Sequence, residues 1–224
     1  MESIQAALTG DLIASSDAGS AAVDGAMEVL RTAAADIAAW RFAESTAVGD
    51  TRFTRFRGDG WQILVSKGTF GPRAALSMYA RLAARPDLPR TRVAIGLGTV
   101  DTLPGPDLSD ALGAALAISG RTLAEMRHGE HLRIAGTAPH GPVTPLTAAF
   151  VALIDDRIAD WTPEQAEAVA RVIAPGAPTQ NAIAASLGIS PQALSARLTG
   201  AKWPTLRTLL ARWEEPQPRA APDD

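Results

Sequence analysis

The chain has 224 residues, 46% of them hydrophobic, and a formal net charge of −3, which suits one substantial hydrophobic core and a smaller one. It contains no cysteine, which excludes disulfides and thiolate metal sites. No charged-then-apolar leader opens the chain and no apolar run is long enough to cross a membrane, so we expect a cytoplasmic protein.

The first element is a mostly apolar run from Ser3 to Ala14, which predicts a buried strand. Asp11 lies near its end, where an ionised carboxylate is costly unless it is paired or binds a cation. The segment Ser15–Asp17 supplies cap-type residues for an Ala-rich helix predicted from Gly19 to Ala43. A strand, a turn of small residues and a helix N-terminus form a favourable binding site for phosphate. Alternatively, Asp11 only begins the helix.

A hairpin is predicted next. Thr51 to Arg57 and Trp61 to Val65 are strand-like, and Asp59-Gly60 between two such runs is a strong hairpin signal. The simpler interpretation of Asp59 is that it only shapes this turn. A functional carboxylate at the same position is the alternative.

Four more elements complete the larger part of the chain. They are a helix over Phe70–Arg85, a strand over Arg92–Leu97, a helix over Leu108–Met126 and a strand over His131–Ala135. The order β-α-β-β-α-β-α-β predicts an α/β (α+β) fold, a ferredoxin-like core with an appended helix and strand. In this order the first strand can lie beside the hairpin, which brings Asp11 towards Asp59.

Several segments resemble the catalytic domain of class III nucleotidyl cyclases. They are Gly10–Ile13, Phe56–Gly60 and Arg92–Gly98, and the stretch Gly120–Ile134 is similar to the last helix and strand of those domains. The resemblance covers about residues 3 to 136 and implies a nucleotidyl-cyclase-type core. Together with the C-terminal extension, the arrangement is similar to the SatD-like family of bacterial proteins.

The resemblance implies that Asp11 and Asp59 bind two divalent cations, Mg²⁺ or Mn²⁺, with the backbone carbonyl of Leu12 as a further ligand. One ion would activate the attacking hydroxyl, and both would clamp the phosphates of a nucleoside triphosphate. Arg121 takes the position of the transition-state arginine, and Arg55 that of a base-reading lysine. Alternatively, Arg121 is a solvated charge on its helix. The candidate nucleotide-binding residues are Ala14, Ser15, Ser16 and Gly58.

One position departs from the cyclase pattern. Four residues before Arg121, where cyclases usually place an Asn that orients the ribose, this chain has Ala117. The departure predicts a domain that binds a nucleotide without cyclising it efficiently.

The C-terminal region is predicted to be helical. Thr144–Ile158 is an apolar helix, and Thr162 begins another with Gln165 at capping-box spacing. Residues 179–199 contain a helix, a turn at Gly188 and a second helix that begins at Ser190, which is typical of a helix-turn-helix. A closing helix is predicted over 205–213.

Charge favours DNA as the partner of this region. From Ala168 to Trp213 the chain carries no acidic residue but five basic residues, namely Arg171, Arg197, Lys202, Arg207 and Arg212. Phosphate contacts supply much of the affinity of proteins for DNA. The candidate DNA-binding residues are Ser190, Gln192, Ser195, Arg197, Lys202 and Arg207. The alternative is a helix pair that binds protein.

These features predict a cyclase-like domain at 1–138, a small all-α region with the helix-turn-helix at 144–215, and a disordered tail at 216–224. The main hypothesis is a DNA-binding regulator, acting as a homodimer on double-stranded DNA, whose cyclase-like domain senses a metal-bound nucleotide. The second hypothesis is an active nucleotidyl cyclase or second-messenger synthase with a regulatory appendage. A protein-interaction scaffold is the third.

Overall fold

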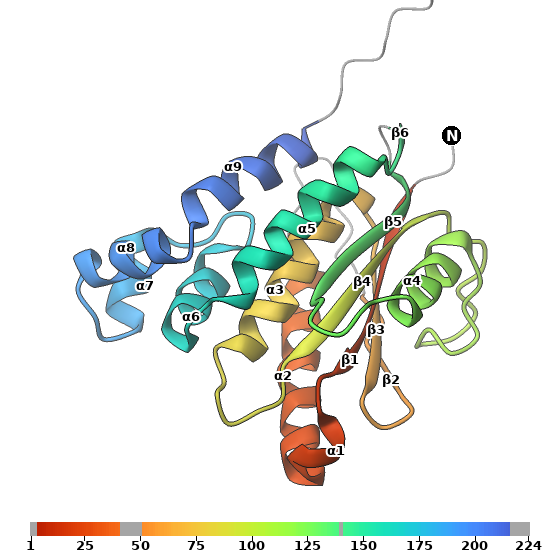
Figure 1. The fold of residues 1–224 in the computed structure, drawn as a ribbon, viewed down its shortest axis with the longest axis horizontal. Helices are drawn as coiled ribbons and strands as arrows, with labels where there is room; N and C mark the ends of the chain where they lie inside the picture. Colours follow the sequence, from red (N-terminus) through yellow and green to blue (C-terminus); the bar gives the residue numbers. More distant parts are fainter. Residues whose placement is uncertain (1–3, 41–50, 139–140, 216–224) are drawn as a thin grey trace, which may run out of the picture.

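A computed structural model of the chain describes residues 4–40, 51–138 and 141–215 (Figure 1). A six-stranded sheet in the order β2-β3-β1-β4-β5-β6 forms its centre. The strands are β1 (Gln5–Leu12), β2 (Thr54–Phe56), β3 (Gly60–Val65), β4 (Thr91–Gly98), β5 (Leu132–Ala138) and β6 (Gly141–Pro142). β4 and β5 are parallel, and the other neighbours are antiparallel. The mixed α/β fold with a ferredoxin-like strand order is therefore confirmed.

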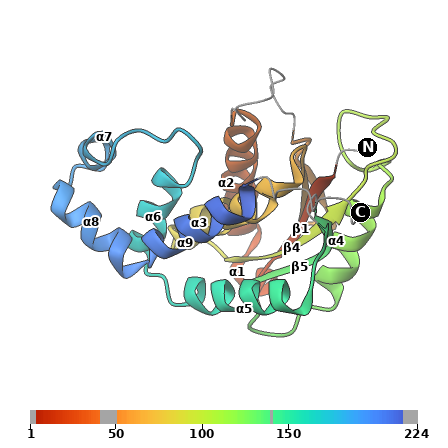
Figure 2. The same ribbon diagram turned by 90° about the horizontal axis from the view of Figure 1, so that it is seen from above.

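Helices cover both faces of the sheet (Figures 1 and 2). α4 (Ala114–Ala124) lies on one face, and α2 (Ser20–Ala38) and α3 (Gly71–Ala83) lie on the other. The other helices are α1 (Ser15–Ala18), the 3-10 helix η1 (Gly68–Phe70), α5 (Pro145–Ala159), α6 (Pro163–Val172), α7 (Gln180–Ser186), α8 (Pro191–Gly200) and α9 (Trp203–Glu214). α6, α7 and α8 lie beyond α3, on the side away from the sheet (Figure 1).

The two faces of the sheet differ because side chains alternate along each strand. On β4, the apolar residues Val93, Ile95 and Leu97 join the large core beneath α2 and α3. Gly96 and Gly98 face α4, and a Cβ at Gly96 would collide with the backbone of α4. These glycines let α4 approach the sheet closely, and the apolar cluster on this face is smaller than the one beneath α2 and α3.

The large core continues into the C-terminal helices. Trp161, Val169, Leu194 and Leu206 are buried in the same cluster as the residues of the sheet. β6 lies between the two predicted domains and pairs with β5, so it extends the sheet. The division into domains at 1–138 and 144–215 stays a prediction.

The C-terminal helices begin at predicted residues. Thr144, Thr179 and Ser190 each accept a backbone hydrogen bond as the N-cap of α5, α7 and α8. Thr162 and Gln165 form the predicted capping box of α6. Gly188, in the turn between α7 and α8, has a φ of 66°, which favours glycine. The assignment of α7 and α8 as a DNA-binding helix-turn-helix stays a prediction.

Two local predictions about helix starts were wrong. The helix predicted from Leu108 begins only at Ala114, because the backbone of Leu112 pairs with that of Thr102. Ser15 and Ser16 do not cap the long helix; α2 begins after Gly19, since the single turn of α1 intervenes.

The hairpin turn also differs from the prediction. Its positive φ angles are at Arg57 and Gly58, while Gly60 is already the first residue of β3. A Cβ at Gly60 would press into the ring of Phe56, so that glycine serves packing across the hairpin. The predicted helix end at Ala43 was wrong, because α2 already ends at Ala38. The predicted strand start at Ser3 and the tail 216–224 lie outside the described residues.

Candidate functional site

A cavity of about 700 Å³ lies between α4 and the α4-facing side of the sheet. Strands β1 to β4 and helix α4 all contribute to its lining. Its charged side chains are Asp11, Arg57, Asp59 and Arg92. The sequence-predicted carboxylates Asp11 and Asp59 are therefore brought to one cavity.

Asp11 is held by a residue that the sequence analysis did not single out. Its two carboxylate oxygens accept hydrogen bonds from Arg92, from Nε at 2.9 Å and from Nη2 at 2.5 Å. The two residues lie directly opposite each other on the antiparallel strands β1 and β4. The hydrogen bond to Asp11 raises the pKa of Arg92, so the guanidinium stays charged. This forked arrangement is the strongest geometry for an Arg–carboxylate pair.

Asp59 lies at the end of the β2–β3 turn. Its Oδ2 accepts a hydrogen bond of 2.5 Å from the Ser15 hydroxyl, and its backbone carbonyl accepts one from the Leu12 amide at 3.2 Å. Asp11 is the register partner of Gly60, the residue after Asp59. The hairpin and the end of β1 therefore hold both carboxylates at one edge of the cavity.

A chain of hydrogen bonds connects the sheet to α4 beside the carboxylates. Gln62 donates its Nε2–H to the Thr9 hydroxyl at 2.8 Å, and the hydroxyls of Thr9 and Ser119 lie 2.7 Å apart. Since Ser119 also donates to the Leu116 carbonyl at 3.0 Å, the proton between the two hydroxyls belongs to Thr9. Thr9 and Gln62 also line the cavity. They make its wall polar, and they already hydrogen-bond to each other.

The structure does not bring Arg55 to the cavity. Thr54 and Phe56 line it, and the alternation of β2 places Arg55 on the opposite face. There Arg55 donates to Asp24 of α2 at 2.8 Å and to the Gly58 carbonyl at 2.6 Å. Arg55 therefore does not join Asp11 and Asp59 at the cavity, and its contact with a base or phosphate stays a prediction.

The other predicted nucleotide residues are scattered. Arg121 is exposed on α4 and does not line the cavity, although Gly120 and Ala124 beside it do. Ala14, which has a φ of 54°, and Ser16 are exposed next to the short helix α1. The Leu12 side chain is buried in the core on the far face of the sheet. Gly58 lies in the hairpin turn with a φ of 86°.

Sequence reasoning missed Arg92, Arg57, Thr9 and Gln62. A signal for Arg92 was present, because it is a charged residue near the start of an otherwise apolar strand. Such a residue needs a partner when it is partly buried. Only the register between β1 and β4 identifies that partner as Asp11.

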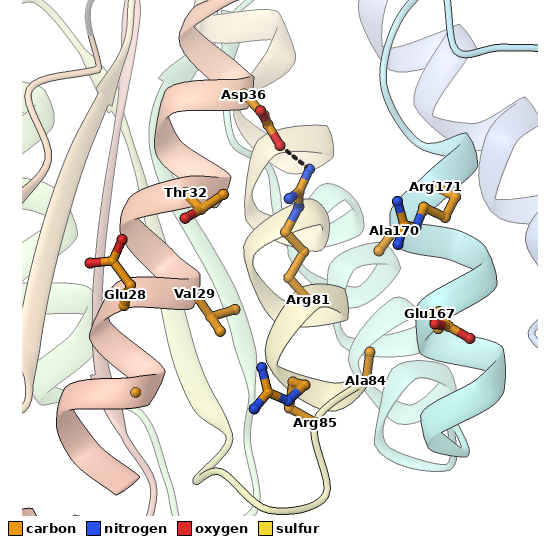
Figure 3. Close-up of a pocket in the computed structure, with 11 residues that line it drawn as sticks. Glu28, Val29, Thr32, Asp36, Arg81, Ala84, Arg85, Glu167, Ala170 and Arg171 are labelled. Carbon is orange, nitrogen blue, oxygen red and sulfur yellow. Dashed lines mark ion pairs between the residues drawn. The ribbon is translucent and has the colours of Figure 1, made fainter. Parts of the chain in front are cut away.

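A second cavity, of about 610 Å³, lies between α2, α3 and α6 (Figure 3). Arg81 and Asp36 form an ion pair across it, and Glu28, Glu167 and Arg171 also line it. Acids and bases are mixed along its walls. We assign this cavity no function.

The predicted DNA-binding residues lie around α8 and the start of α9. Ser190, Gln192, Ser195, Lys202 and Arg207 are exposed. Arg197 instead donates to Glu167 of α6 at 3.0 Å, which explains its partial burial.

The described residues contain no group of three or more His, Asp or Glu side chains that could hold a metal ion without other donors. Within the described ranges, no helix combines the length and apolar character needed to cross a bilayer.

No protein-family model matches the chain, and no curated protein matches it. Solved structures with a similar fold include two of bacterial light-regulated adenylyl cyclases, each 16% identical over 60% of this chain, with TM-scores of 0.41 and 0.39. A third is the guanylyl cyclase Cya2, 15% identical over 60% of this chain and 77% of its own, with a TM-score of 0.37. The chain spans 44% and 43% of the two adenylyl cyclases.

Proposed function

We propose that the cavity between α4 and the sheet binds a nucleoside triphosphate together with a divalent cation, as in a nucleotidyl cyclase-like domain. The observation that carries the proposal is the convergence of Asp11 and Asp59 on one cavity from distant parts of the chain. Arg92 already balances the charge of Asp11, whereas Asp59 forms no ion pair among the described residues and is left to attract a cation. We also propose that the chain is a member of the SatD-like family.

The donors of the site fit Mg²⁺ or Mn²⁺ when the nucleotide supplies the remaining oxygens. Mg²⁺ bound with nucleotides usually takes one or two protein carboxylates, and phosphates and water complete its coordination. Asp59 offers a carboxylate whose only side-chain partner among the described residues is the neutral Ser15 hydroxyl. A bound cation would neutralise phosphate charge and polarise the reacting phosphoryl group.

The protein's own residues would orient the nucleotide. Arg57 and Arg92 place positive charge beside the carboxylates, which suits a polyanion. The polar wall of Thr9 and Gln62 offers groups that can reorient towards a base or ribose. The volume of about 700 Å³ is within the range of small-molecule sites.

Cyclisation would require more than these groups. Arg121 is exposed on α4 and does not line the cavity of its own chain. It could therefore contact a bound triphosphate only in the cavity of a second copy of the chain. The proposal therefore includes a homodimer for any catalytic form, while nucleotide binding needs one chain alone. Ala117 in place of an Asn favours binding over rapid turnover.

The test is to measure nucleotide binding by calorimetry with each nucleoside triphosphate and Mn²⁺, and to identify products by mass spectrometry. We expect Asp59→Asn to weaken binding about tenfold or more, since a charged contact contributes roughly 1.5–3 kcal/mol. Asp156→Asn, which changes an exposed carboxylate on α5, is the control and should bind as the unmodified chain does. Binding that is equal in all three proteins would refute the proposal. A cyclic product lost in Asp59→Asn would identify an enzyme, and binding without product a sensor.

DNA binding by α8 and α9 is a second candidate function. It is favoured by the exposure of Gln192, Ser195, Lys202 and Arg207 in a region without acidic residues. Replacing both Lys202 and Arg207 by Gln should weaken binding to duplex DNA and lower its salt dependence by about one counterion per contact. Arg171→Gln, on α6, is the matched control in an anisotropy titration. Equal affinity and salt slope in all variants would exclude this function.

A further inference from the structure

The arrangement of Arg92 around Asp11 bears on how many cations the nucleotide site can take. Both oxygens of Asp11 are engaged by one guanidinium, which a metal ion would have to displace. Nη1 of Arg92, which takes no part in the fork, donates to the Met126 carbonyl at 3.5 Å, so each guanidinium nitrogen has a partner. The two side chains are each 27% exposed, which makes the pair less screened than a surface ion pair.

The pair is built into the sheet. Asp11 and Arg92 are direct register partners on neighbouring antiparallel strands, where side chains on one face are close neighbours. No backbone movement is needed to form the pair, and little side-chain entropy remains to be lost. Arginine also keeps its charge at every pH that the fold tolerates, so deprotonation cannot release Asp11.

Asp59 differs from Asp11 in its partners. Among the described residues its carboxylate accepts only the Ser15 hydroxyl, a neutral donor, and forms no ion pair. Among these residues Asp59 therefore has no cation in direct contact, whereas Asp11 has Arg92. A divalent cation entering the cavity would find a stronger attraction at Asp59 and a competing positive charge at Asp11.

We propose that Arg92 is a resident cation of the nucleotide site, occupying the place of one divalent ion at Asp11, so that the chain binds one divalent ion, at Asp59. This inference rests on the proposed metal–nucleotide function and specifies its cation requirement. The guanidinium has more N–H donors than its bonds to Asp11 and Met126 use, and these can meet a phosphate oxygen. Arg92 thereby becomes a positioning group for both the carboxylate and the triphosphate.

The experiment titrates Mn²⁺ into the full chain with inorganic tripolyphosphate present to supply the phosphate oxygens, and measures protein-bound Mn²⁺ by electron paramagnetic resonance against a protein-free blank. The unmodified protein should bind one ion per chain. Arg92→Gln, which removes the charge, should bind a second ion or bind Mn²⁺ about tenfold more tightly, because a nearby unit charge has been removed. Adding Asp11→Asn to Arg92→Gln should abolish this gain.

Two further variants keep the test decisive. Arg92→Lys retains a cation and should keep the single-ion stoichiometry, even though its hydrogen-bond fork is lost. Arg85→Gln, which removes an exposed charge that pairs with Asp87, is the control for net charge. The Mn²⁺-induced rise in Tm, measured on the same samples, shows that each variant is folded and reports ion binding independently.

The outcomes separate this inference from the proposed function. Two ions in the unmodified chain, with no change in Arg92→Gln, would overturn the role of Arg92 and leave the metal–nucleotide site standing. Absence of Mn²⁺ binding and of nucleotide binding in every variant would overturn both. A single ion that survives Asp59→Asn would also refute the proposed position of the cation.

Discussion

At the scale of single residues, the strands around the cavity depend on close packing across β1. Trp61 is fully buried on β3, and its indole Nε1–H donates to the Thr91 hydroxyl at 2.9 Å. A Cβ at Gly10 would collide with the Trp61 ring and the Arg92 carbonyl. The glycine therefore permits the spacing that places Asp11 opposite Arg92 and beside the hairpin.

Tyr79 gives a prediction at the same scale. Its hydroxyl donates to the Ile158 carbonyl at 3.2 Å and accepts a hydrogen bond from Arg90 at 3.4 Å. Burial raises the pKa of Tyr79 above its usual 10.0, although Arg90 acts in the opposite direction. Because the folded state then holds the phenol proton more tightly, the contribution of Tyr79 to the free energy of unfolding is constant below pH 10.0 and declines above it.

The chain has one tyrosine, so tyrosinate absorbance reports Tyr79 directly. We expect its titration in the folded protein to lie above that in urea, and Tyr79→Phe to remove part of the loss of stability at alkaline pH. The five tryptophans give no comparable ionisation and serve as an internal reference. Titration of the folded protein at or below pH 10.0 would contradict the prediction.

At the scale of elements, a buried ion pair connects α3 to α9. Arg73 donates to both carboxylate oxygens of Glu214, at 2.6 and 2.8 Å, and to the Ile173 carbonyl at 2.8 Å. The side chains of Arg73 and Glu214 are only 10% and 12% exposed. Loss of one member leaves the other charge buried without compensation, which is more costly than loss of a surface pair.

Arg73→Met should therefore lower the free energy of unfolding by roughly 3–5 kcal/mol, measured by urea denaturation. Adding Glu214→Met should recover much of the loss, since no unpaired charge then remains. The matched control is Arg85→Met, which breaks the exposed pair with Asp87 and should leave stability nearly unchanged. A similar loss in both single variants would show that the buried pair contributes no more than the exposed one.

At the scale of the whole molecule, the sheet and the C-terminal helices form one packed body. Ile158, Trp161 and Ile173 are buried in the cluster that also contains Tyr79 and Leu97. Arg90, Tyr79 and Arg73 all bond to the carbonyls of this C-terminal part. Among the described residues, a continuous core rather than a loose linker thus connects the sheet with α7 and α8.

Much of the fold could be predicted from local signals. The apolar run of β1, the capping box of Thr162 and the Gly188 turn each specify a structure within a few neighbouring residues. The order of strands and helices limited the possible sheets, and it correctly placed β1 beside the hairpin. The turn at Arg57–Gly58 was missed, because Gly58 and Gly60 lie two residues apart and each is a local turn signal.

The sequence alone determined most of the longer strands and helices and the presence of two carboxylates at strand ends, because local periodicity and turn chemistry encode these features. Only the tertiary structure decided that Arg55 faces away from the cavity and that Arg92 forms an ion pair with Asp11. These facts depend on strand register and on which face each strand presents. Register is fixed by packing between residues far apart in the chain, which no local pattern records.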